Sequence, residues 1–256
     1  MRVPLAPAFR SLPLAHRGYH DRAAGRPENS RAAFRAAVAA GYGIELDVQL
    51  AADGQAVVFH DDQLDRLTAR TGPVLSYTTA ELDRIRLLGS DETIPALTTV
   101  LELVGGRVPV LIEIKDRAGA LAPTDGRLET AVAAALAGYP GPVAVMSFNP
   151  DCVAGMARLA PLIPRGLTTE CFDPAQWAPL SPALCARLRE IPDYDPTLSS
   201  FISHKAADLS YPRVGDLKAQ GAAILCWTVR SPQAEARARL VAQNITFEGY
   251  KALIPA

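Results

Sequence analysis

The sequence predicts an α/β fold, and within that class a (β/α)₈ TIM barrel. Short apolar runs alternate with helical patterns along nearly the whole chain, which is the signal for β/α units around a parallel sheet. The length of 256 residues suits one such barrel, which typically takes about 250 residues. Polar residues also fall at the carboxyl ends of the apolar runs, the face where barrel enzymes place their chemistry.

An open doubly wound sheet is the competing architecture. The chain has neither a G-x-G-x-x-G turn nor a P-loop, which are the turns that such sheets use to bind nucleotides. No internal repeat or low-complexity linker divides the sequence. We therefore expect residues 1–256 to form a single barrel domain.

The composition excludes several classes of protein. Hydrophobic residues make up 49% and charged residues 21%, an ordinary globular mixture. A net charge of −1 offers no large basic face for nucleic acid or anionic membranes. The 4 cysteines show no C-x-x-C pair or zinc spacing, which indicates reduced thiols. With no signal peptide and no run long enough to span a membrane, we expect a soluble cytoplasmic protein of undetermined oligomeric state.

The first β/α unit covers residues 12–41. An apolar run at 12–15 ends in His16 and Arg17, and a polar loop follows. Asn29 or Ser30 then caps a helix. Its apolar positions follow the i, i+3, i+4, i+7 pattern of a helix face: Phe34, Ala37, Val38 and Gly41.

The second strand, at the start of 43–60, carries Glu45 and Asp47 two residues apart. In a strand this spacing puts both carboxylates on one face, roughly 6.5 Å apart along the backbone. Two poorly hydrated carboxylates repel each other and need a compensating cation. A tight turn at Asp53-Gly54 then returns the chain and brings His60 near the acids.

Residues 61–95 are expected to form a small insertion after the second strand. One helix begins in it at the capping box Thr78-x-x-Glu81 and turns Leu82 and Ile85 inward. Beyond it, a helix from Pro95 and the helices that follow alternate with further strands, and 173–195 is the least readable segment. The expected strands are 108–114, 143–148, 164–169, 201–203, 222–229 and 245–247.

Three acids stand out as candidate metal ligands. Glu45, Asp47 and Glu113 would form an all-oxygen site that suits Mg²⁺, Mn²⁺ or Ca²⁺ better than zinc. His16 and His60 reach the same end of the barrel and are natural acid and base groups near neutral pH. Together with positive charge for an anionic oxygen, supplied by Arg17 and Lys115, this set describes phosphodiester cleavage.

These residues occur in motifs that resemble the glycerophosphodiester phosphodiesterase family. The likeness runs from about residue 14 to about 249, and the order and spacing of the motifs make it specific. The motifs are His16-Arg17-Gly18, Pro27-Glu28-Asn29-Ser30, Glu45-Leu46-Asp47-Val48, Val57-Val58-Phe59-His60-Asp61, Glu113-Ile114-Lys115, Ser147-Phe148-Asn149-Pro150 and Trp227-Thr228-Val229.

The resemblance implies a phospholipase-C-like barrel that hydrolyses glycerophosphodiesters to sn-glycerol 3-phosphate and an alcohol. It assigns the three acids to one divalent cation, Mg²⁺ or Ca²⁺ with Mn²⁺ also suitable, and His16 and His60 to acid/base catalysis, with His16 favoured as the base. Arg17 and Lys115 would hold the phosphate of this small-molecule substrate. Further substrate contacts are expected from Ser147, Phe148 and Trp227.

Several readings stay open at this point. The same site would serve a lysophospholipase D-type or a cyclising phosphodiesterase, or a non-catalytic phosphodiester-binding protein. The alternative for Lys115 is that it neutralises Glu113, and the alternative for Trp227 is that it packs in the core. The chain also departs from the common family ending after its last strand, where it reads Phe247-Glu248-Gly249. The preferred alcohol and the roles of His204, Lys205 and Glu248 are therefore undetermined.

Overall fold

A computed structural model describes residues 2–116 and 121–255. Within these residues, all strands belong to one 9-stranded sheet. The strands are β1 (Leu14–Ala15), β2 (Gly43–Leu50), β3 (Ala56–Val58), β4 (Val110–Ile114), β5 (Val143–Ser147), β6 (Arg165–Thr169), β7 (Phe201–Lys205), β8 (Ala223–Val229) and β9 (Asn244–Phe247).

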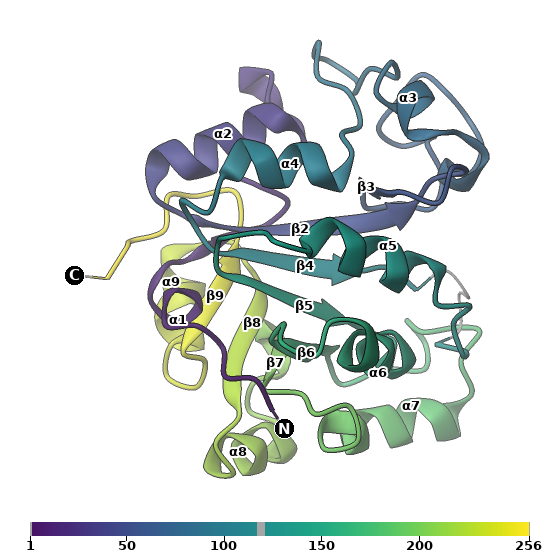
Figure 1. Cartoon of the computed structure of the whole chain (residues 1–256). Helices are drawn as coiled ribbons and strands as arrows, with labels where there is room; N and C mark the ends of the chain where they lie inside the picture. The colour runs from purple at the N-terminus through teal and green to yellow at the C-terminus, as the bar shows by residue number, and fades with distance from the viewer. Residues whose placement is uncertain (1, 117–120, 256) are drawn as a thin grey trace.

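The sheet closes into a barrel of eight parallel strands. Its order is β1-β9-β8-β7-β6-β5-β4-β2-β3, and an additional parallel pairing of β1 with β2 completes the ring. Helices outside the ring follow the strands (Figure 1). Those that follow the strands are α2 (Arg31–Ala40), α4 (Leu97–Val104), α5 (Arg127–Leu136), α6 (Pro150–Leu159), α7 (Pro182–Arg189), α8 (Pro212–Ala219) and α9 (Pro232–Ala238). In contrast, α1 (Ala8–Ser11) precedes β1, and α3 (Thr79–Leu82) lies in the insertion. The predicted (β/α)₈ barrel is thus confirmed, and the open doubly wound sheet is excluded.

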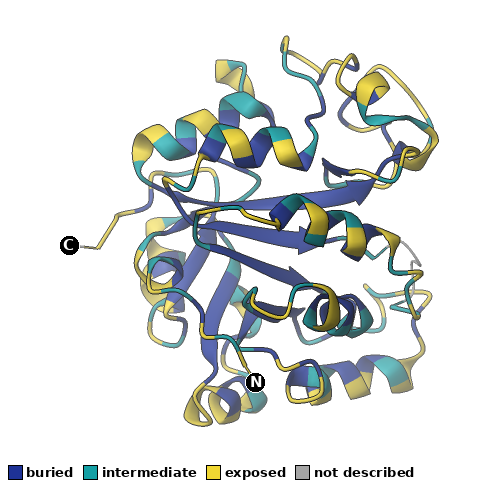
Figure 2. Cartoon of the chain, viewed as in Figure 1, coloured by how far each residue is buried: buried dark blue, intermediate teal, exposed yellow. Residues whose placement is uncertain are grey.

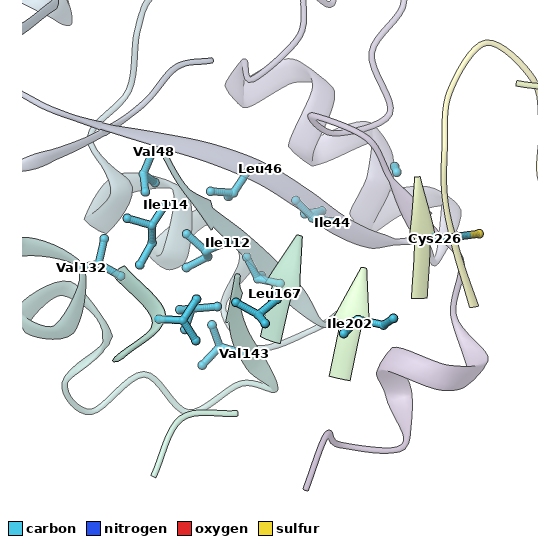
Figure 3. Packing of buried hydrophobic residues seen from close by; sticks show 14 of the residues in the cluster. Ile44, Leu46, Val48, Ile112, Ile114, Val132, Val143, Leu167, Ile202 and Cys226 are labelled. Atoms are coloured by element: carbon cyan, nitrogen blue, oxygen red, sulfur yellow. The ribbon is translucent and has the colours of Figure 1, made fainter. Parts of the chain in front are cut away.

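The main apolar core lies between the outer face of the barrel and the helices. Ile44, Leu46 and Val48 of β2 join it, together with residues of the neighbouring strands and helices (Figure 3). The helices expose their opposite faces, so that buried strands are surrounded by half-exposed helices (Figure 2). The alternation predicted for β2 is therefore correct, and Glu45 and Asp47 point into the barrel.

A second apolar cluster fills the amino-terminal end of the barrel interior. Leu14, Leu111, Phe201 and Leu225 from four different strands pack there against Phe9 of α1. Asn244 of β9 donates hydrogen bonds from Nδ2 to the carbonyl oxygens of Phe9 (2.8 Å) and Leu12 (2.6 Å). The interior is therefore a packed core at this end, and polar groups are left to the other end.

The insertion after the second strand packs around its own small core. β3 pairs antiparallel with β2 as expected for the Asp53-Gly54 turn, and the chain then forms the lobe around α3 (Figure 1). Thr78 and Glu81 make both hydrogen bonds of the predicted capping box. Leu82 and Ile85 turn inward, into a cluster that includes Phe59, Leu64 and Ile94.

The structure corrects two local predictions and decides between the two candidate caps of α2. The first strand covers only Leu14–Ala15, because residues 8–11 form the unexpected helix α1 and Leu12 caps it. Ser30, and not Asn29, caps α2 by accepting a hydrogen bond from the amide of Ala33 (3.1 Å). The sixth predicted strand, 201–203, extends to Lys205.

Two further expectations concern cysteines and membranes. All four cysteines are free thiols, and Cys152, Cys185 and Cys226 are buried as expected. In the described part of the chain, no helix combines the length and apolar character needed to cross a membrane.

Candidate active site

Three buried acids meet inside the barrel at its carboxyl end. Glu45 and Asp47 lie on β2 and Glu113 on β4, where Asp47 and Glu113 are paired in the parallel register. The three residues are 2%, 1% and 8% exposed, respectively. Each offers a carboxylate oxygen that lies within 4.8 Å of those of the other two. The predicted all-oxygen cluster is therefore assembled, and its donors are those that hard divalent cations prefer.

Two basic side chains partly compensate the acids. Lys115 Nζ lies 2.6 Å from Asp47 Oδ1 and also bonds Glu113. Arg17 Nε lies 3.4 Å from Asp47 Oδ2, and its backbone amide donates to Glu45 Oε2 (3.0 Å). When all three carboxylates are ionised, they exceed these two cations by one negative charge. Lys115 thus contacts two of the three acids.

The buried charges shift the pKa values of the acids in opposite directions. Burial, reinforced by the charges of Asp47 and Glu113, raises the pKa of Glu45 well above its ordinary value. Burial would also raise the pKa of Asp47, but Lys115, His60 and Arg17 hold it below its usual range. Asp47 is consequently the carboxylate that remains ionised most readily, and Glu45 is the acid most in need of an added cation.

His16 stands directly above β1 and is oriented by Glu248. The Nδ1 atom of His16 lies 2.5 Å from Glu248 Oε2, while its Nε2 atom lies 4.0 Å from Glu45 Oε2. Glu248 also approaches Nε2 of His20 (3.4 Å) and accepts a hydrogen bond from Nε of Arg230 (2.7 Å). Because Glu248 accepts a hydrogen bond from Nδ1–H, the Nε2 atom of His16 is left facing the acids.

His60 follows β3 and is oriented by its sequence neighbour. Its Nδ1 atom lies 2.6 Å from Asp61 Oδ1, and the backbone amide of Phe59 donates to the carbonyl oxygen of Asp47 (3.0 Å). Burial, followed by the nearby charge of Lys115, lowers the pKa of His60. Both imidazoles therefore lie at the same end of the barrel as the acids, each with a carboxylate on Nδ1.

A chain of ion pairs connects the insertion to the first loop. Arg66 binds Asp61 through Nε (2.6 Å) and Glu28 through Nη1 (3.0 Å). Glu28 in turn binds Nη1 of Arg17 (2.5 Å). Asp61, which holds His60, is thereby tied through these side chains to Arg17.

Asn29 braces the acid cluster. It is 1% exposed and has a positive φ of 56°. Its Nδ2 donates to Asp47 Oδ2 (2.8 Å) and its Oδ1 accepts from the backbone amide of Asp47 (3.4 Å). The side chain thus fixes Asp47 from the loop before α2.

The residues expected to line the substrate site differ in how far they are exposed to a substrate. Ser147 is fully buried, and its hydroxyl donates to the carbonyl oxygen of Ile114 (2.7 Å). Phe148 and Trp227 are half-buried, with ring centroids 5.5 Å apart. Trp227 also donates from its indole nitrogen to the carbonyl oxygen of Ser203 (3.0 Å).

The undetermined residues separate into three groups. Glu248 belongs to the site through His16. Lys205 pairs instead with Glu170, away from the three acids. His204 is fully buried and bonds Thr169 Oγ1 through Nδ1 (2.8 Å).

The groups that orient the catalytic candidates were not predicted from the sequence. Asp61 carried a usable signal, since it immediately follows His60. Glu248 carried only its position at the end of the last strand, because 232 residues separate it from His16. Asn29 was considered mainly as a helix cap, and its bond to Asp47 depends on a backbone conformation that no local pattern indicates.

The fold and the site define an enzyme of the phosphodiester-hydrolase class built on a (β/α)₈ barrel. Comparison with known proteins agrees: the model of the glycerophosphoryl diester phosphodiesterase family matches residues 16–246. The chain belongs to this family and is a phosphodiesterase of its type.

Individual relatives show the same relationship. A glycerophosphodiester phosphodiesterase of Caldanaerobacter subterraneus is 33% identical over 172 residues, which cover 64% of this chain and 68% of the relative. The solved structure of a glycerophosphodiester phosphodiesterase from Agrobacterium tumefaciens is 27% identical, with a TM-score of 0.68 and coverage of 93% and 96%. A phosphodiesterase of Oleispira antarctica, solved with its product sn-glycerol-3-phosphate, has the same fold at 24% identity, with a TM-score of 0.75 and coverage of 92% and 91%.

Proposed function

We propose that this phosphodiesterase hydrolyses glycerophosphodiesters to sn-glycerol 3-phosphate and an alcohol in a reaction that depends on a divalent cation. The observation that carries the proposal is the convergence of three buried carboxylates and two carboxylate-oriented imidazoles at one end of the barrel. Family membership over residues 16–246 supports the substrate class. We also propose that residues 1–256 act as one catalytic domain, because the insertion supplies Asp61, which holds His60, and the barrel supplies the acids.

The three acids fit a divalent cation such as Mg²⁺ or Ca²⁺, with Mn²⁺ as a further candidate. Glu45, Asp47 and Glu113 would hold it through oxygen atoms, and their excess negative charge favours its binding. Bound there, the cation supplies positive charge for the phosphate oxygens. A cation that draws on Asp47 and Glu113 also competes with Lys115 for the same oxygens.

Arg17 and Lys115 supply positive charge for the substrate phosphate. Both lie at the acid cluster, and each has N–H groups that can donate hydrogen bonds to a phosphate oxygen. The excess charge that develops on these oxygens during the reaction is stabilised most strongly by donors that are already in place. Glu28 fixes one edge of the Arg17 guanidinium, so that less side-chain freedom is lost on binding.

The two histidines share the proton transfers. We assign His16 as the base that activates the nucleophile, since Glu248 on its Nδ1 leaves Nε2 available as a proton acceptor. His60 is assigned to act in its protonated form, with Nδ1–H bound to Asp61, and to donate its Nε2 proton to the leaving alcohol oxygen. The roles of Ser147, Phe148 and Trp227 also remain proposals: Ser147 supports the backbone of the site through its buried hydroxyl, and the two aromatic rings line the substrate.

The first experiment tests the activity itself. Purified protein incubated with glycerophosphocholine or glycerophosphoethanolamine and Mg²⁺ or Ca²⁺ is expected to release sn-glycerol 3-phosphate, while chelator abolishes the release. Phosphorus NMR distinguishes this product from the cyclic phosphate of a cyclising enzyme. Binding without turnover across diesters, cations and pH would instead indicate a non-catalytic phosphodiester-binding protein.

The second experiment separates the two histidines. His60→Ala is expected to abolish turnover of glycerophosphoethanolamine with the fold retained in circular dichroism and cation binding retained in calorimetry. On a glycerophosphodiester of nitrophenol, whose anion leaves without protonation, His60→Ala is expected to recover most of the activity and His16→Ala is not. The opposite pattern would exchange the two roles, and near-normal turnover by either variant on glycerophosphoethanolamine would refute the assignment.

A further inference from the structure

An apolar cavity of about 320 Å³ adjoins the acid cluster. Glu113 and Lys115, at the carboxyl end of β4, form its polar edge, so that the cavity and the acid cluster share one wall. Its volume falls in the range of small-molecule pockets. A group attached to a phosphodiester held at Lys115 would therefore have the cavity within reach.

The remaining walls of the cavity are mostly hydrocarbon. Phe148 contributes one ring, and Trp177, Pro179 and Leu180 come from the segment between β6 and α7. Ile114 contributes from the strand end. Such a lining gains free energy in proportion to the apolar area that a ligand buries against it.

The wall between β6 and α7 is held in place before any ligand binds. Trp177 donates from its indole nitrogen to Glu170 Oε1 (2.6 Å), and Glu170 is itself paired with Lys205. The Trp177 ring packs against Phe148 and Phe172 with centroid distances of 5.2 and 5.0 Å. Glu170, supported by Lys205, therefore fixes the orientation of Trp177 in the wall of the cavity.

Leu180 anchors the same wall to α7. It is 8% exposed and packs with Phe172, Cys185 and Leu188 in a small separate core. A preorganised apolar wall costs little conformational entropy when a ligand binds. The segment between β6 and α7 therefore forms a wall of the cavity that is already ordered before a ligand binds.

The walls of the cavity, and not the charges at its edge, argue against a quaternary ammonium head group as its occupant. Glu113 is bonded to Lys115. Asp116 accepts hydrogen bonds from Asn149 Nδ2 (3.0 Å) and the amide of Leu121 (2.8 Å). Among the described lining residues, two aromatic rings contribute and the other apolar walls are aliphatic, whereas quaternary ammonium groups are recognised by cages of aromatic faces.

We propose that this cavity binds an alkyl chain carried by the phosphodiester, so that the preferred substrates are chain-bearing glycerophosphodiesters. This inference rests on the proposed function and names its substrate class. The chain can be attached to the leaving alcohol, as in an alkyl ester of glycerol phosphate, or to the glycerol, as in a lysophospholipid. The chemistry recognised by the cavity is the same in both.

Chain length provides the first test. For glycerophospho-n-alkanols from ethanol to octanol, kcat/KM is expected to rise about fourfold per added methylene until the cavity is full. A parallel series of lysophosphatidylethanolamines with increasing acyl length, assayed below their micellar concentrations, shows whether the glycerol side supplies the chain. The series that rises identifies the source. Flat profiles in both series, with good turnover of short diesters, would overturn the inference while the proposed function stands.

The head-group alternative is tested in the same assay. Glycerophosphocholine is expected to be a poorer substrate than glycerophosphohexanol. A preference of tenfold or more for glycerophosphocholine would show that the cavity takes a quaternary ammonium group and would overturn the alkyl assignment.

A pair of leucine variants locates the chain. Leu180→Ala is expected to flatten the chain-length dependence, because it removes apolar wall from the cavity. Leu240→Ala makes the same change at a residue that is 81% exposed, far along the chain from the cavity wall, and is expected to keep the dependence. An unchanged slope in a folded Leu180→Ala variant would contradict the proposed location.

A binding measurement is independent of turnover and of the stability of Leu180→Ala. The chain contains 2 tryptophans, so Trp227→Phe leaves Trp177 as the reporter of the cavity. Titration with n-hexyl or n-octyl phosphate is expected to shift its emission to shorter wavelength, and inorganic phosphate is not. Chain-dependent binding, together with a wild-type protein that has no diesterase activity, would uphold the cavity and refute the proposed function. Equal responses to phosphate and octyl phosphate would refute the cavity.

Discussion

His16 depends for its orientation on a residue from the other end of the chain. Glu248 lies within hydrogen-bond distance of His16 Nδ1, and burial, which alone would raise its pKa, is outweighed by His16 and His20, so that the pKa of Glu248 lies below its ordinary range. Glu248 is therefore an anion at neutral pH and favours the imidazole tautomer that presents Nε2 to the site. It acts as a positioning residue.

Replacing this carboxylate is expected to impair catalysis more than binding. Glu248→Gln should lower kcat by roughly one hundredfold, because an amide holds the imidazole less firmly and does not select its tautomer. KM and the affinity for the divalent cation should change by much less, since the acids are untouched. Steady-state kinetics and calorimetry together check this.

Glu102→Gln provides the matched control, because it makes the same chemical change on the exposed side of α4. It is expected to leave both parameters at the wild-type value. A loss in Glu248→Gln that appears only in cation affinity would assign Glu248 to the metal site instead.

His204 gives the stability of the protein a specific pH dependence. Burial lowers the pKa of His204 to about 4, with Asp208 opposing and Lys205 assisting the shift. The unfolded chain takes up this proton near pH 6.5, whereas the folded protein takes it up only near its lowered pKa. The stability contributed by neutral His204 is thus fully present above pH 6.5 and is lost as the pH falls toward 4.

Between pH 7.5 and 4.5 this single group should reduce the free energy of unfolding by about 2.5 kcal/mol. Urea unfolding of wild type and His204→Asn at both pH values isolates the contribution, because asparagine keeps a polar atom for Thr169 and does not titrate. Equal losses of stability in the two proteins would show that other groups dominate.

The acids and their supporting residues were not equally visible in the sequence. Glu45 and Asp47 reveal themselves through their spacing in an apolar strand, since burying two carboxylates without a purpose is costly. Lys115 and Glu113 share that spacing on β4. The roles of Glu248 and Asn29 could not be predicted, because these residues act through contacts with His16 and Asp47 that form only when the barrel closes.

At the scale of elements, close packing between strands fixes where glycine is required. Gly166 of β6 is paired with Phe201 of β7. A methyl group on Gly166 would lie 2.5 Å from Phe201 Cδ2 and 2.6 Å from the carbonyl oxygen of Phe201. Because the backbone is one of the obstacles, a side-chain shift alone does not relieve the contact.

Two glycine-to-alanine changes should therefore have opposite signs. Gly166→Ala is expected to destabilise the protein by about 3 kcal/mol through overpacking. Gly215→Ala lies in α8 with no atom within 4 Å of the added methyl group, and it should stabilise the protein by up to about 0.8 kcal/mol through helix propensity. Urea midpoints measure both, and a neutral Gly166→Ala would mean that β6 and β7 separate more easily than this packing suggests.

Long elements with a clear period were predictable, and short ones were not. β2 and α2 show apolar periods of a strand and a helix over enough residues to be recognised. β1 has only two residues, and α1 has four, so that neither is long enough to repeat its period. Their structure is imposed by the closed barrel and by Phe9 in its interior.

At the scale of the whole molecule, binding of a divalent cation should appear as increased stability. A ligand that binds only the folded state at 100 times its Kd stabilises it by about 2.7 kcal/mol, which corresponds to a rise in Tm of about 5 to 10 °C for a chain of this size. Differential scanning fluorimetry with Mg²⁺ or Ca²⁺ measures this rise.

Asp47→Asn should show a much smaller increase in Tm, because the asparagine removes one ligand charge from the cluster. Asp91→Asn makes the same change at a side chain that is 92% exposed and should respond like wild type. Equal responses of all three proteins to the cation would place its binding outside the three acids.

The overall architecture was accessible from the sequence because it rests on repetition. Each β/α unit repeats an apolar strand and an amphipathic helix, and the polar strand ends then meet at one face of the barrel. The apolar cavity beside Glu113 was not accessible, because Trp177 and Leu180 come from the segment whose prolines obscure any period. Its shape depends on tertiary contacts with Phe148 and Phe172.

The way in which the first residues of the chain pack at the amino-terminal end of the barrel has a practical consequence for handling the enzyme. Arg2 donates a hydrogen bond to the carbonyl oxygen of Ser199 (2.8 Å), just before β7. Phe9 lies in the apolar cluster at the amino-terminal end of the barrel interior. A fusion partner, surface tether or resin joined ahead of this segment would thus depart from the pole opposite the acids. Immobilised in that way, the enzyme would present its open end to the surrounding solution, and diffusion of diesters would proceed unobstructed by the support.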